Sequence, residues 1–316
     1  MKVVNYAPII VFAYNRLGNL TKTIDTLVKA EGVEKTDLFI WCDGNKSDQD
    51  KFKVEEVRKY VRQYKNISRF RTVTINESPT NKGLASSVIS GVSSVLEKYS
   101  KVIVVEDDLL VSADFIEYMN EALMFYEKDQ RIFSIGGWTP DLPFLEKYDK
   151  DIIISNRFEC WGWGIWKDRW ETIVWDYDRY SMASRNEIKC LSTAGRDLKG
   201  MFYSYLDGKI DSWAVRAACH LIWNNKYVVV PSKSKVKNIG LDGSGTNCGN
   251  REQHPSEQIS NSNHVNFITM YSDDELNRRL WLYYSYGTKG EKLSFADMVR
   301  YFIHHSLRGF HTITYY

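Results

Sequence analysis

Three consecutive carboxylates, Glu106, Asp107 and Asp108, directly follow the apolar run Val102–Val105. Holding three acidic side chains together at the end of a buried strand is unfavourable, because like charges raise one another's pKa unless a cation or hydrogen-bond donors compensate. Mg²⁺ and Mn²⁺ prefer oxygen ligands and often bind through one or two carboxylates plus the phosphates of a substrate. This acidic triplet therefore predicts a divalent-metal site; the alternative is a solvated strand end that caps the next helix.

Polar residues that suit phosphate or base recognition follow other apolar runs. Asn15 and Arg16 come after residues 9–13, and Arg16 could pair with phosphate or orient an acid, or be a surface residue at a helix start. Asp43 is a candidate hydrogen-bond acceptor, or a turn residue before a glycine. Lys82 precedes a predicted helix N-terminus, where backbone N–H groups favour phosphate, although a plain turn would look the same.

The elements that must position these residues alternate between strand and helix. Strand-like runs cover residues 9–13, 38–41, 70–75 and 102–105, and helical patterns cover 20–28, 50–64, 84–96 and 113–126, with Ser112 as the expected cap of the last helix. This order predicts an α/β fold with a mostly parallel sheet and helices on both faces. Ligands of such sheets bind beyond the C-terminal ends of the strands, which is where Asn15, Arg16, Asp43 and the acidic triplet lie.

The second half of the chain is less regular. We expect strands at 152–154 and 227–230, a helix at 212–224, a glycine-rich loop at 237–249 that could close over a ligand, and a mobile polar stretch at 250–263. Between these, Trp161, Trp163 and Trp166 alternate with glycines. Their indole faces could stack on sugar rings, or they could form a packed core turn.

Residues 102–119 (VIVVEDDLLVSADFIEYM) closely resemble the metal-site segment of the animal Golgi β-1,2-N-acetylglucosaminyltransferases that act on mannose. Residues 13–16 and 42–44 are similar to the first- and second-strand motifs of those enzymes, and residues 158–170 (FECWGWGIWKDRW) to their acceptor-side segment. The likeness runs from about residue 8 to 249, and the chain as a whole also resembles bacterial surface-polysaccharide glycosyltransferases. The resemblance implies a GT-A (Rossmann-like) fold, with a nucleotide-binding α/β domain and an acidic metal motif.

The same resemblance implies roles for individual carboxylates. Asp108 would ligate the metal ion directly. Glu106 and Asp107 would contact ribose, sugar or metal-bound water. Asp43 would accept a hydrogen bond from N3–H of uracil, and the first-strand motif would lie against the nucleotide.

An inverting transfer also needs a base that removes the proton of the acceptor hydroxyl. In the resembled animal enzymes this base is an acidic residue directly before a tryptophan, but here Ser212 occupies that position before Trp213. Asp211, one residue earlier, is our first candidate, and the alternative is that Asp211 or Ser212 simply caps the helix. Glu159 is the second candidate, because a partly buried glutamate among tryptophans would have the raised pKa that suits a base.

We therefore expect a metal-dependent, inverting glycosyltransferase that uses Mn²⁺ or Mg²⁺. It would move N-acetylglucosamine or another hexose from a UDP-sugar to a glycan or lipid-linked glycan acceptor in surface-polysaccharide synthesis. One alternative is a sugar nucleotidyltransferase, although the loop after the first strand is too short for the phosphate cradle of those enzymes. Another is a non-catalytic carbohydrate-binding protein of the same fold.

Bulk properties limit the partners and the location. A net charge of +2 over 316 residues gives no strong field for nucleic acid. Five widely spaced cysteines, no signal peptide and no apolar run of ~20 residues favour a cytoplasmic protein. We expect a glycosyltransferase domain at 1–250, with a nucleotide-binding half (1–130) and an acceptor half (131–250), followed by a loop and an amphipathic helical extension at 251–316. An apolar face within 295–310 would touch the inner face of the membrane, or dock on the domain or a second subunit.

Overall fold

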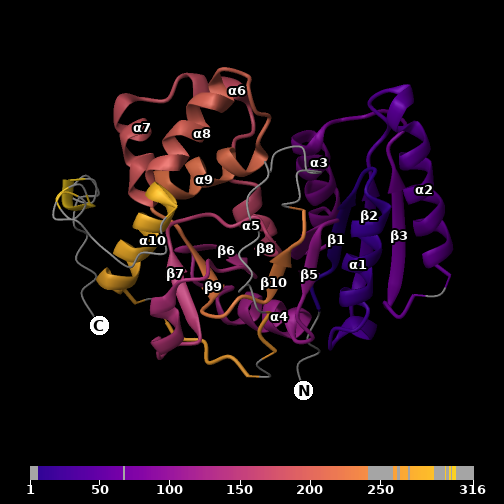
Figure 1. Ribbon diagram of the computed structural model, residues 1–316, viewed down its shortest axis with the longest axis horizontal. Coiled ribbons are helices and arrows are strands. Elements are labelled where there is room, and N and C mark those ends of the chain that lie inside the picture. The colour runs from indigo at the N-terminus through magenta and orange to yellow at the C-terminus, as the bar shows by residue number, and fades with distance from the viewer. Residues whose placement is uncertain are drawn as a thin grey trace.

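The computed structural model describes residues 6–66, 68–240, 259–261, 264–269, 271–287, 296, 299 and 301–303. An eight-stranded sheet runs through the structure in the order β3-β2-β1-β4-β8-β6-β9-β7 (Figure 1). Its strands are β1 Ile9–Ala13, β2 Asp37–Cys42, β3 Thr72–Glu77, β4 Lys101–Glu106, β6 Ile132–Gly136, β7 Ile152–Ser155, β8 Trp163–Trp166 and β9 Tyr227–Pro231. A separate antiparallel pair joins β5 Leu109–Val111 to β10 Val236–Asn238.

The four N-terminal strands of the sheet, β1 to β4, are all parallel to one another. Beyond β4 the directions mix: β8 is antiparallel to β4 and β6, β6 and β9 are parallel, and β7 is antiparallel to β9. In register, Ala13 pairs with Cys42 and Phe12 with Glu106. The chain segments that follow β1, β2 and β4 therefore leave the sheet side by side.

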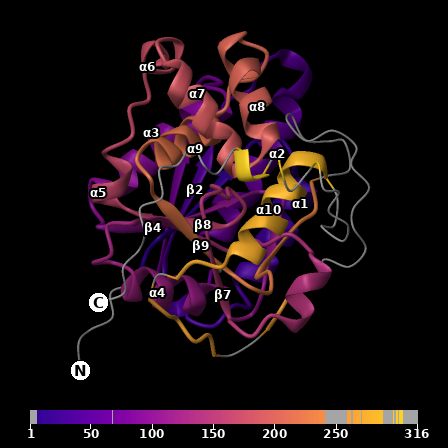
Figure 2. The ribbon, with the colours of Figure 1, turned by 90° about the vertical axis from the view of Figure 1, so that its left-hand side faces the viewer.

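Helices cover both faces of this sheet, as the alternating pattern predicted. They are α1 Leu17–Leu27, α2 Asp48–Tyr64, α3 Leu84–Leu96, α4 Phe115–Phe125, α5 Lys167–Trp170, α6 Tyr177–Ser181, α7 Arg185–Leu191, α8 Arg196–Leu206, α9 Trp213–Trp223 and α10 Asp274–Tyr286, with short 3₁₀ turns at Val33–Lys35, Pro143–Lys147 and Ser192–Ala194. Helices α6 to α9 gather at one end of the molecule, above the sheet (Figures 1 and 2).

Two hydrophobic cores lie on opposite faces of the sheet, because successive side chains of a strand point in opposite directions. Ile9 and Val11 of β1 belong to the core that contains α1, α2 and α4, whereas Ile10 and Phe12 belong to the core that contains α3 and α9. Both sets are buried, which explains why the strand has a continuous apolar sequence instead of an alternating one.

Several helices and strands begin or end at residues other than those predicted from the sequence. The expected cap at Ser112 is wrong, because β5 forms directly after the acidic triplet; α4 begins only at Phe115, and the Ser112 hydroxyl donates to Asp114 instead. The third strand lies two residues later than expected, and β6 was not predicted. Most of the loops expected at 237–249 and 250–263, most of the segment 295–310 and the proposed boundary at residue 250 lie outside the described residues.

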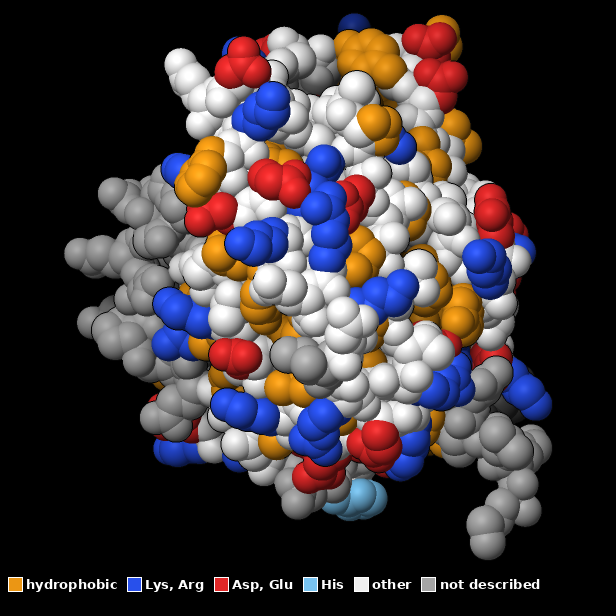
Figure 3. Space-filling view, turned by 90° about the vertical axis from the view of Figure 1, so that its right-hand side faces the viewer, with side chains coloured by type: hydrophobic (Ala, Val, Ile, Leu, Met, Phe, Trp, Pro, Cys, Tyr) orange, Lys and Arg blue, Asp and Glu red, His pale blue; other side chains and the backbone are white. Residues whose placement is uncertain are grey.

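The face that carries α2 and β3 shows basic and acidic side chains interspersed, without separation into regions of one sign (Figure 3). This mixing matches the near balance of charges in the sequence. Among the described residues, no helix is both long enough and apolar enough to cross a membrane.

Candidate active site

The parallel strands bring Arg16 and the acidic triplet together. The Arg16 guanidinium, just after β1, hydrogen-bonds the Asp107 carboxylate through Nη2, and its Nη1 lies 2.9 Å from Oδ2 of Asp108. Both aspartates are about 95% buried, and the carbonyl of Asp107 is fixed by the Thr23 hydroxyl of α1 at 2.9 Å. Asn15 lies half-buried in the same turn. The single guanidinium of Arg16 thus pairs with two buried carboxylates.

Negative charge is incompletely compensated at this edge. Burial, and after it the charges of Asp108 and Asp107, raise the pKa of Glu106 to about 8. Burial also raises the pKa of Asp107 to about 6, although the positive charge of Arg16 opposes the shift. A further cation near the acidic triplet would lower both pKa values, so the site favours binding positive charge.

The acidic triplet fits a divalent cation that shares its ligands with a substrate. Oδ1 of Asp108 is buried and has no hydrogen-bond partner among the described residues, while Oδ2 faces Arg16. No group of three or more His, Cys, Asp or Glu side chains in the described part of the chain is arranged to hold a metal ion alone. An ion held by Asp108 would take its remaining ligands from water and from phosphate oxygens, as Mg²⁺ commonly does.

Gly240 closes the other side of Asp108. The Ile239 N–H donates to the Asp108 carbonyl at 2.8 Å, and a Cβ added to Gly240 would lie 2.0 Å from Oδ2 of Asp108. Glycine is required at this position because the backbone that follows β10 runs directly against the carboxylate.

We predict that Gly240→Ala lowers the free energy of unfolding by about 1–3 kcal/mol, because the added methyl group must displace either the Asp108 side chain or the backbone that follows β10. Urea denaturation measures this change. Gly18→Ala is the matched control, since an added Cβ at Gly18 would meet no atom within 4 Å. Equal stability of the two variants would contradict the close contact of Gly240 with Asp108.

Asp43 joins the end of β2 to the turn before α3. Its Oδ1 accepts the N–H groups of Gly44 at 2.8 Å and Lys82 at 2.9 Å, and its Oδ2 accepts the Gly83 N–H at 3.1 Å. The Lys82 side chain is exposed, and Gly83 has a φ of +77°. Asp43 and Lys82, 39 residues apart, are therefore neighbours, and the carboxylate organises the turn.

Asp211 lies at the start of α9 and reaches the same turn. Its Oδ2 is 3.9 Å from where a Cβ of Gly83 would stand, and its Oδ1 is 3.5 Å from Nη2 of Arg216. The cap of α9 is Ser212, whose hydroxyl accepts the Val215 N–H at 3.2 Å. Since Ser212 caps the helix, the Asp211 carboxylate stays 65% exposed at the rim of the site.

Glu159 lies in the loop before β8 and is held by a different group of residues. The Tyr284 hydroxyl of α10 donates to its carboxylate, and the Arg157 guanidinium stacks over the Tyr284 ring at 4.5 Å. Arg157 also makes two hydrogen bonds, of 2.9 and 2.8 Å, to Asp197 of α8. Burial raises the pKa of Glu159 to about 7, opposed by Arg157 and by the Tyr284 hydrogen bond.

This shift predicts a pH dependence of stability that Glu159→Gln removes. The folded protein keeps the Glu159 proton up to about pH 7, whereas the unfolded chain loses it near the ordinary value of 4.5. The unfolded state thus binds fewer protons in this window, so the stability of the wild type relative to Glu159→Gln should fall as pH rises, by up to ~1.4 kcal/mol per pH unit. Urea titrations at pH 4.5, 6 and 8 test this, and a constant difference would refute the shifted pKa.

Of the two interpretations of the tryptophans, the packed core applies to Trp163 and Trp166. Both are fully buried in β8, where Trp163 stacks on Trp213 with ring centroids 5.0 Å apart and the Trp166 indole donates to the Leu123 carbonyl at 3.0 Å. Their faces are occupied by the protein core. Trp161 is half-buried, and its ring packs against Trp138 with centroids 4.7 Å apart.

Sequence inspection missed Tyr284 and Arg58, which contact the predicted site residues Glu159 and Asp43, and the ion pair of Arg157 with Asp197 beside Tyr284. Tyr284 lies 125 residues from Glu159, and no local pattern indicates their contact. Arg58 lies within a strongly charged helix, where its sequence does not distinguish it from solvent-exposed neighbours.

The ends of the parallel strands carry Arg16, Asp43 and the acidic triplet, which is the arrangement expected from the resemblance to glycosyltransferases of the GT-A type. A sequence model of the GNT-I family matches residues 1–176, more than half of the chain. The chain therefore belongs to the GNT-I family. Among curated proteins, none matches this sequence significantly.

Solved structures give partial matches. One is "Mannosyltransferase PcManGT from Pyrobaculum calidifontis in complex with GDP-Man and Mn2+", with 12% identity, a TM-score of 0.34 and coverage of 52% of this chain and 46% of that one. Another is S. aureus TarS 1-349, with 13% identity, a TM-score of 0.40 and coverage of 75% of this chain and 61% of that one. This chain thus corresponds to less than two thirds of either protein, and family membership rests on the sequence model.

Proposed function

We propose that this glycosyltransferase is metal-dependent and inverting, and that it transfers a hexose or N-acetylhexosamine from a UDP-sugar to a glycan or lipid-linked glycan acceptor. The observation that carries the proposal is the buried Oδ1 of Asp108, which lacks a hydrogen-bond partner in the described structure beside two further carboxylates. Bound at Asp108, Mn²⁺ or Mg²⁺ would neutralise the departing diphosphate and act as a Lewis acid.

Arg16 and Asp43 would bind the two ends of the nucleotide. Arg16 pairs with the carboxylates of Asp107 and Asp108, and its guanidinium suits a phosphate oxygen as well. An ionised carboxylate offers about four lone-pair sites, and three of those on Asp43 are taken by backbone N–H groups. The remaining site can accept the N3–H of uracil, which supports a uridine nucleotide as donor.

For the base that activates the acceptor hydroxyl we propose Asp211, with Glu159 second. Asp211 is exposed at the rim of the site and is not needed as the helix cap, so its carboxylate, paired with Arg216 only through Oδ1, can accept from an incoming hydroxyl. Glu159 has a pKa near neutrality, but its carboxylate is enclosed by Tyr284 and Arg157.

The biological setting is part of the proposal. Resemblance to bacterial polysaccharide enzymes supports a role in surface-glycan assembly at the cytoplasmic side of the membrane. We also propose that residues 1–250 form the transferase domain and that 251–316 extend it.

Thermal shift with nucleotide-sugars tests this function. UDP-, GDP-, dTDP- and CMP-sugars would be screened with and without Mn²⁺, on the wild type and on Asp108→Asn. A donor at 100 times its Kd stabilises the folded state by about 2.7 kcal/mol. We expect a metal-dependent shift with UDP-sugars that Asp108→Asn removes. No shift with any nucleotide-sugar would overturn the proposal and favour a carbohydrate-binding protein of the same fold.

A further inference from the structure

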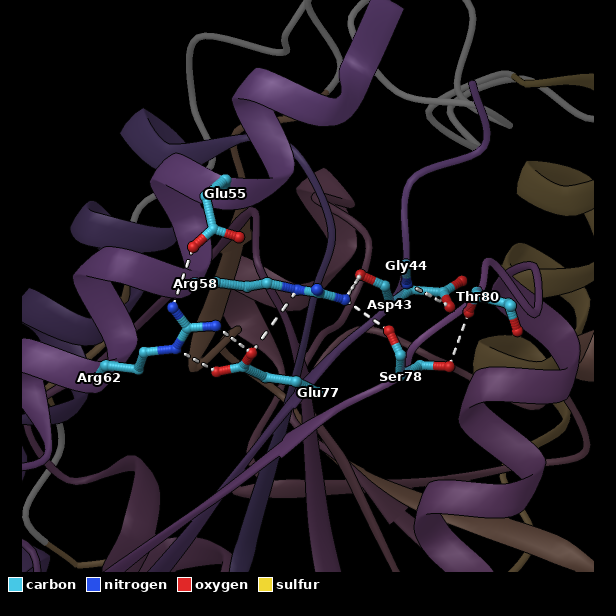
Figure 4. Close-up of polar contacts among 8 residues, drawn as sticks. All are labelled: Asp43, Gly44, Glu55, Arg58, Arg62, Glu77, Ser78 and Thr80. Carbon is cyan, nitrogen blue, oxygen red and sulfur yellow. Dashed lines mark hydrogen bonds and ion pairs between the residues drawn. The ribbon is translucent and has the colours of Figure 1, made fainter. Parts of the chain in front are cut away.

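Arg58 of α2 joins the ends of two neighbouring strands. Its side chain is only 16% exposed, and its Nη2 donates to the carbonyl oxygens of Asp43, at 3.3 Å, and Ser78, at 2.5 Å (Figure 4). Asp43 directly follows β2, and Ser78 directly follows β3. A single charged nitrogen therefore fixes the two loops relative to each other.

Further contacts make the two loops one unit. The Ser78 hydroxyl donates to the Thr80 carbonyl at 2.7 Å, and the Asn81 amide donates to the Gly44 carbonyl at 2.8 Å. A Cβ on Gly44 would lie 2.3 Å from the carbonyl carbon of Thr80, so the two backbones are in direct contact. Within this unit the Asp43 carboxylate accepts its three backbone N–H hydrogen bonds.

The Arg58 guanidinium makes its hydrogen bonds to the two loop carbonyls and not to the neighbouring acidic side chain. Glu77 is 3.9 Å from Nε of Arg58, and that Nε is buried without a hydrogen-bond partner in the described structure. Arg62, one turn further along α2, binds Glu77 with a 2.7 Å hydrogen bond and Glu55 with a 2.9 Å one, on the exposed side of the network (Figure 4). Arg62 therefore neutralises Glu77 but touches neither loop carbonyl in the contacts described.

We propose that Arg58 is a positioning residue for the base end of the donor site, because it holds Asp43 and the turn at 78–83 in the arrangement that presents the Asp43 carboxylate. This inference rests on the proposed function, which assigns that end of the site to the nucleotide base. Arg58 itself contacts loop backbone and acts through Asp43.

The test compares Arg58→Met with Arg62→Met, the same chemical change one helical turn away. Calorimetry with UDP and Mn²⁺ should show about ten-fold weaker binding for Arg58→Met, equivalent to ~1.4 kcal/mol, and a near wild-type Kd for Arg62→Met. Pyrophosphate with Mn²⁺ probes only the acidic triplet, and its affinity should be the same in both variants. In turnover assays Arg58→Met should raise the donor KM and leave kcat unchanged.

Arg58→Lys should recover most of the UDP affinity, because both carbonyls are bound by one nitrogen that an ammonium group can replace. If Arg58→Met does not fold, Arg58→Lys is compared with Arg62→Lys, with a loss of about three-fold expected. Equal UDP affinity in the Arg58 and Arg62 variants, or parallel loss of UDP and pyrophosphate binding, would overturn the inference while the proposed function stands. If the wild type binds no nucleotide, the proposed function fails, and this inference with it.

Discussion

Asp108→Asn should reduce kcat by about a thousand-fold or more, equivalent to at least ~4 kcal/mol of transition-state stabilisation. Asparagine keeps the shape of the side chain but removes the negative charge that would hold a cation beside the diphosphate. Asp107 cannot substitute easily, because its carboxylate is already hydrogen-bonded by the Arg16 guanidinium. Initial rates over a Mn²⁺ titration measure the effect.

Asp25→Asn provides the matched control. Asp25 lies on the exposed side of α1, so the same loss of charge should leave kcat and the metal response unchanged. Retention of a metal-dependent rate in Asp108→Asn would show that the cation binds elsewhere. A comparable loss in both variants would point to an effect of net charge alone.

The part of the candidate site formed by Arg16, Asp43 and the acidic triplet was predictable because its geometry follows from local patterns. Apolar strands and amphipathic helices alternate up to residue 126, and parallel strands must end at one edge of the sheet. Since β1 lies between β2 and β4, the residues that follow these strands become neighbours. Arg16 contacts Asp107, 91 residues further along the chain, because of this strand order alone; no sequence signal links the two residues.

The second half of the chain was less predictable, because the same sequence pattern can arise from either of two structural causes. Glycines between tryptophans could admit a substrate, but Gly164 instead admits α4: a Cβ there would lie 2.9 Å from Cε of Met119 and 3.2 Å from Cδ1 of Leu123. The glycine marks close packing of a helix on β8, which is a recognised use of glycine in strands. Only the sheet order, with β8 antiparallel between β4 and β6, decides between the two causes.

Support from distant residues was also beyond sequence reasoning. Tyr284 reaches Glu159 because α10 packs against α8, and a tight approach of Tyr284 to Gly195 accompanies this contact. Such tertiary contacts depend on how helices of the second half pack, and periodicity shows only which face of each helix is apolar.

Asp211→Asn should lower kcat by roughly 10²–10⁴-fold, the usual contribution of a general base, and should leave the Kd for UDP unchanged. The exposed carboxylate lies beside the turn that Asp43 organises, and Ser212 caps α9 without it, so the variant should fold normally. Single-turnover rates at saturating donor measure the loss, with circular dichroism as the check on folding.

Glu159→Gln is the competing variant in the same experiment, and the pH profile separates the two candidates. If Asp211 is the base, Glu159→Gln keeps most of the rate. If Glu159 is the base, Glu159→Gln loses more than Asp211→Asn, and the wild-type rate falls below about pH 7, because burial raises the pKa of Glu159 to about 7. Full rates in both variants would exclude both carboxylates as the base, since an inverting displacement requires a group that takes the acceptor proton as the new bond forms.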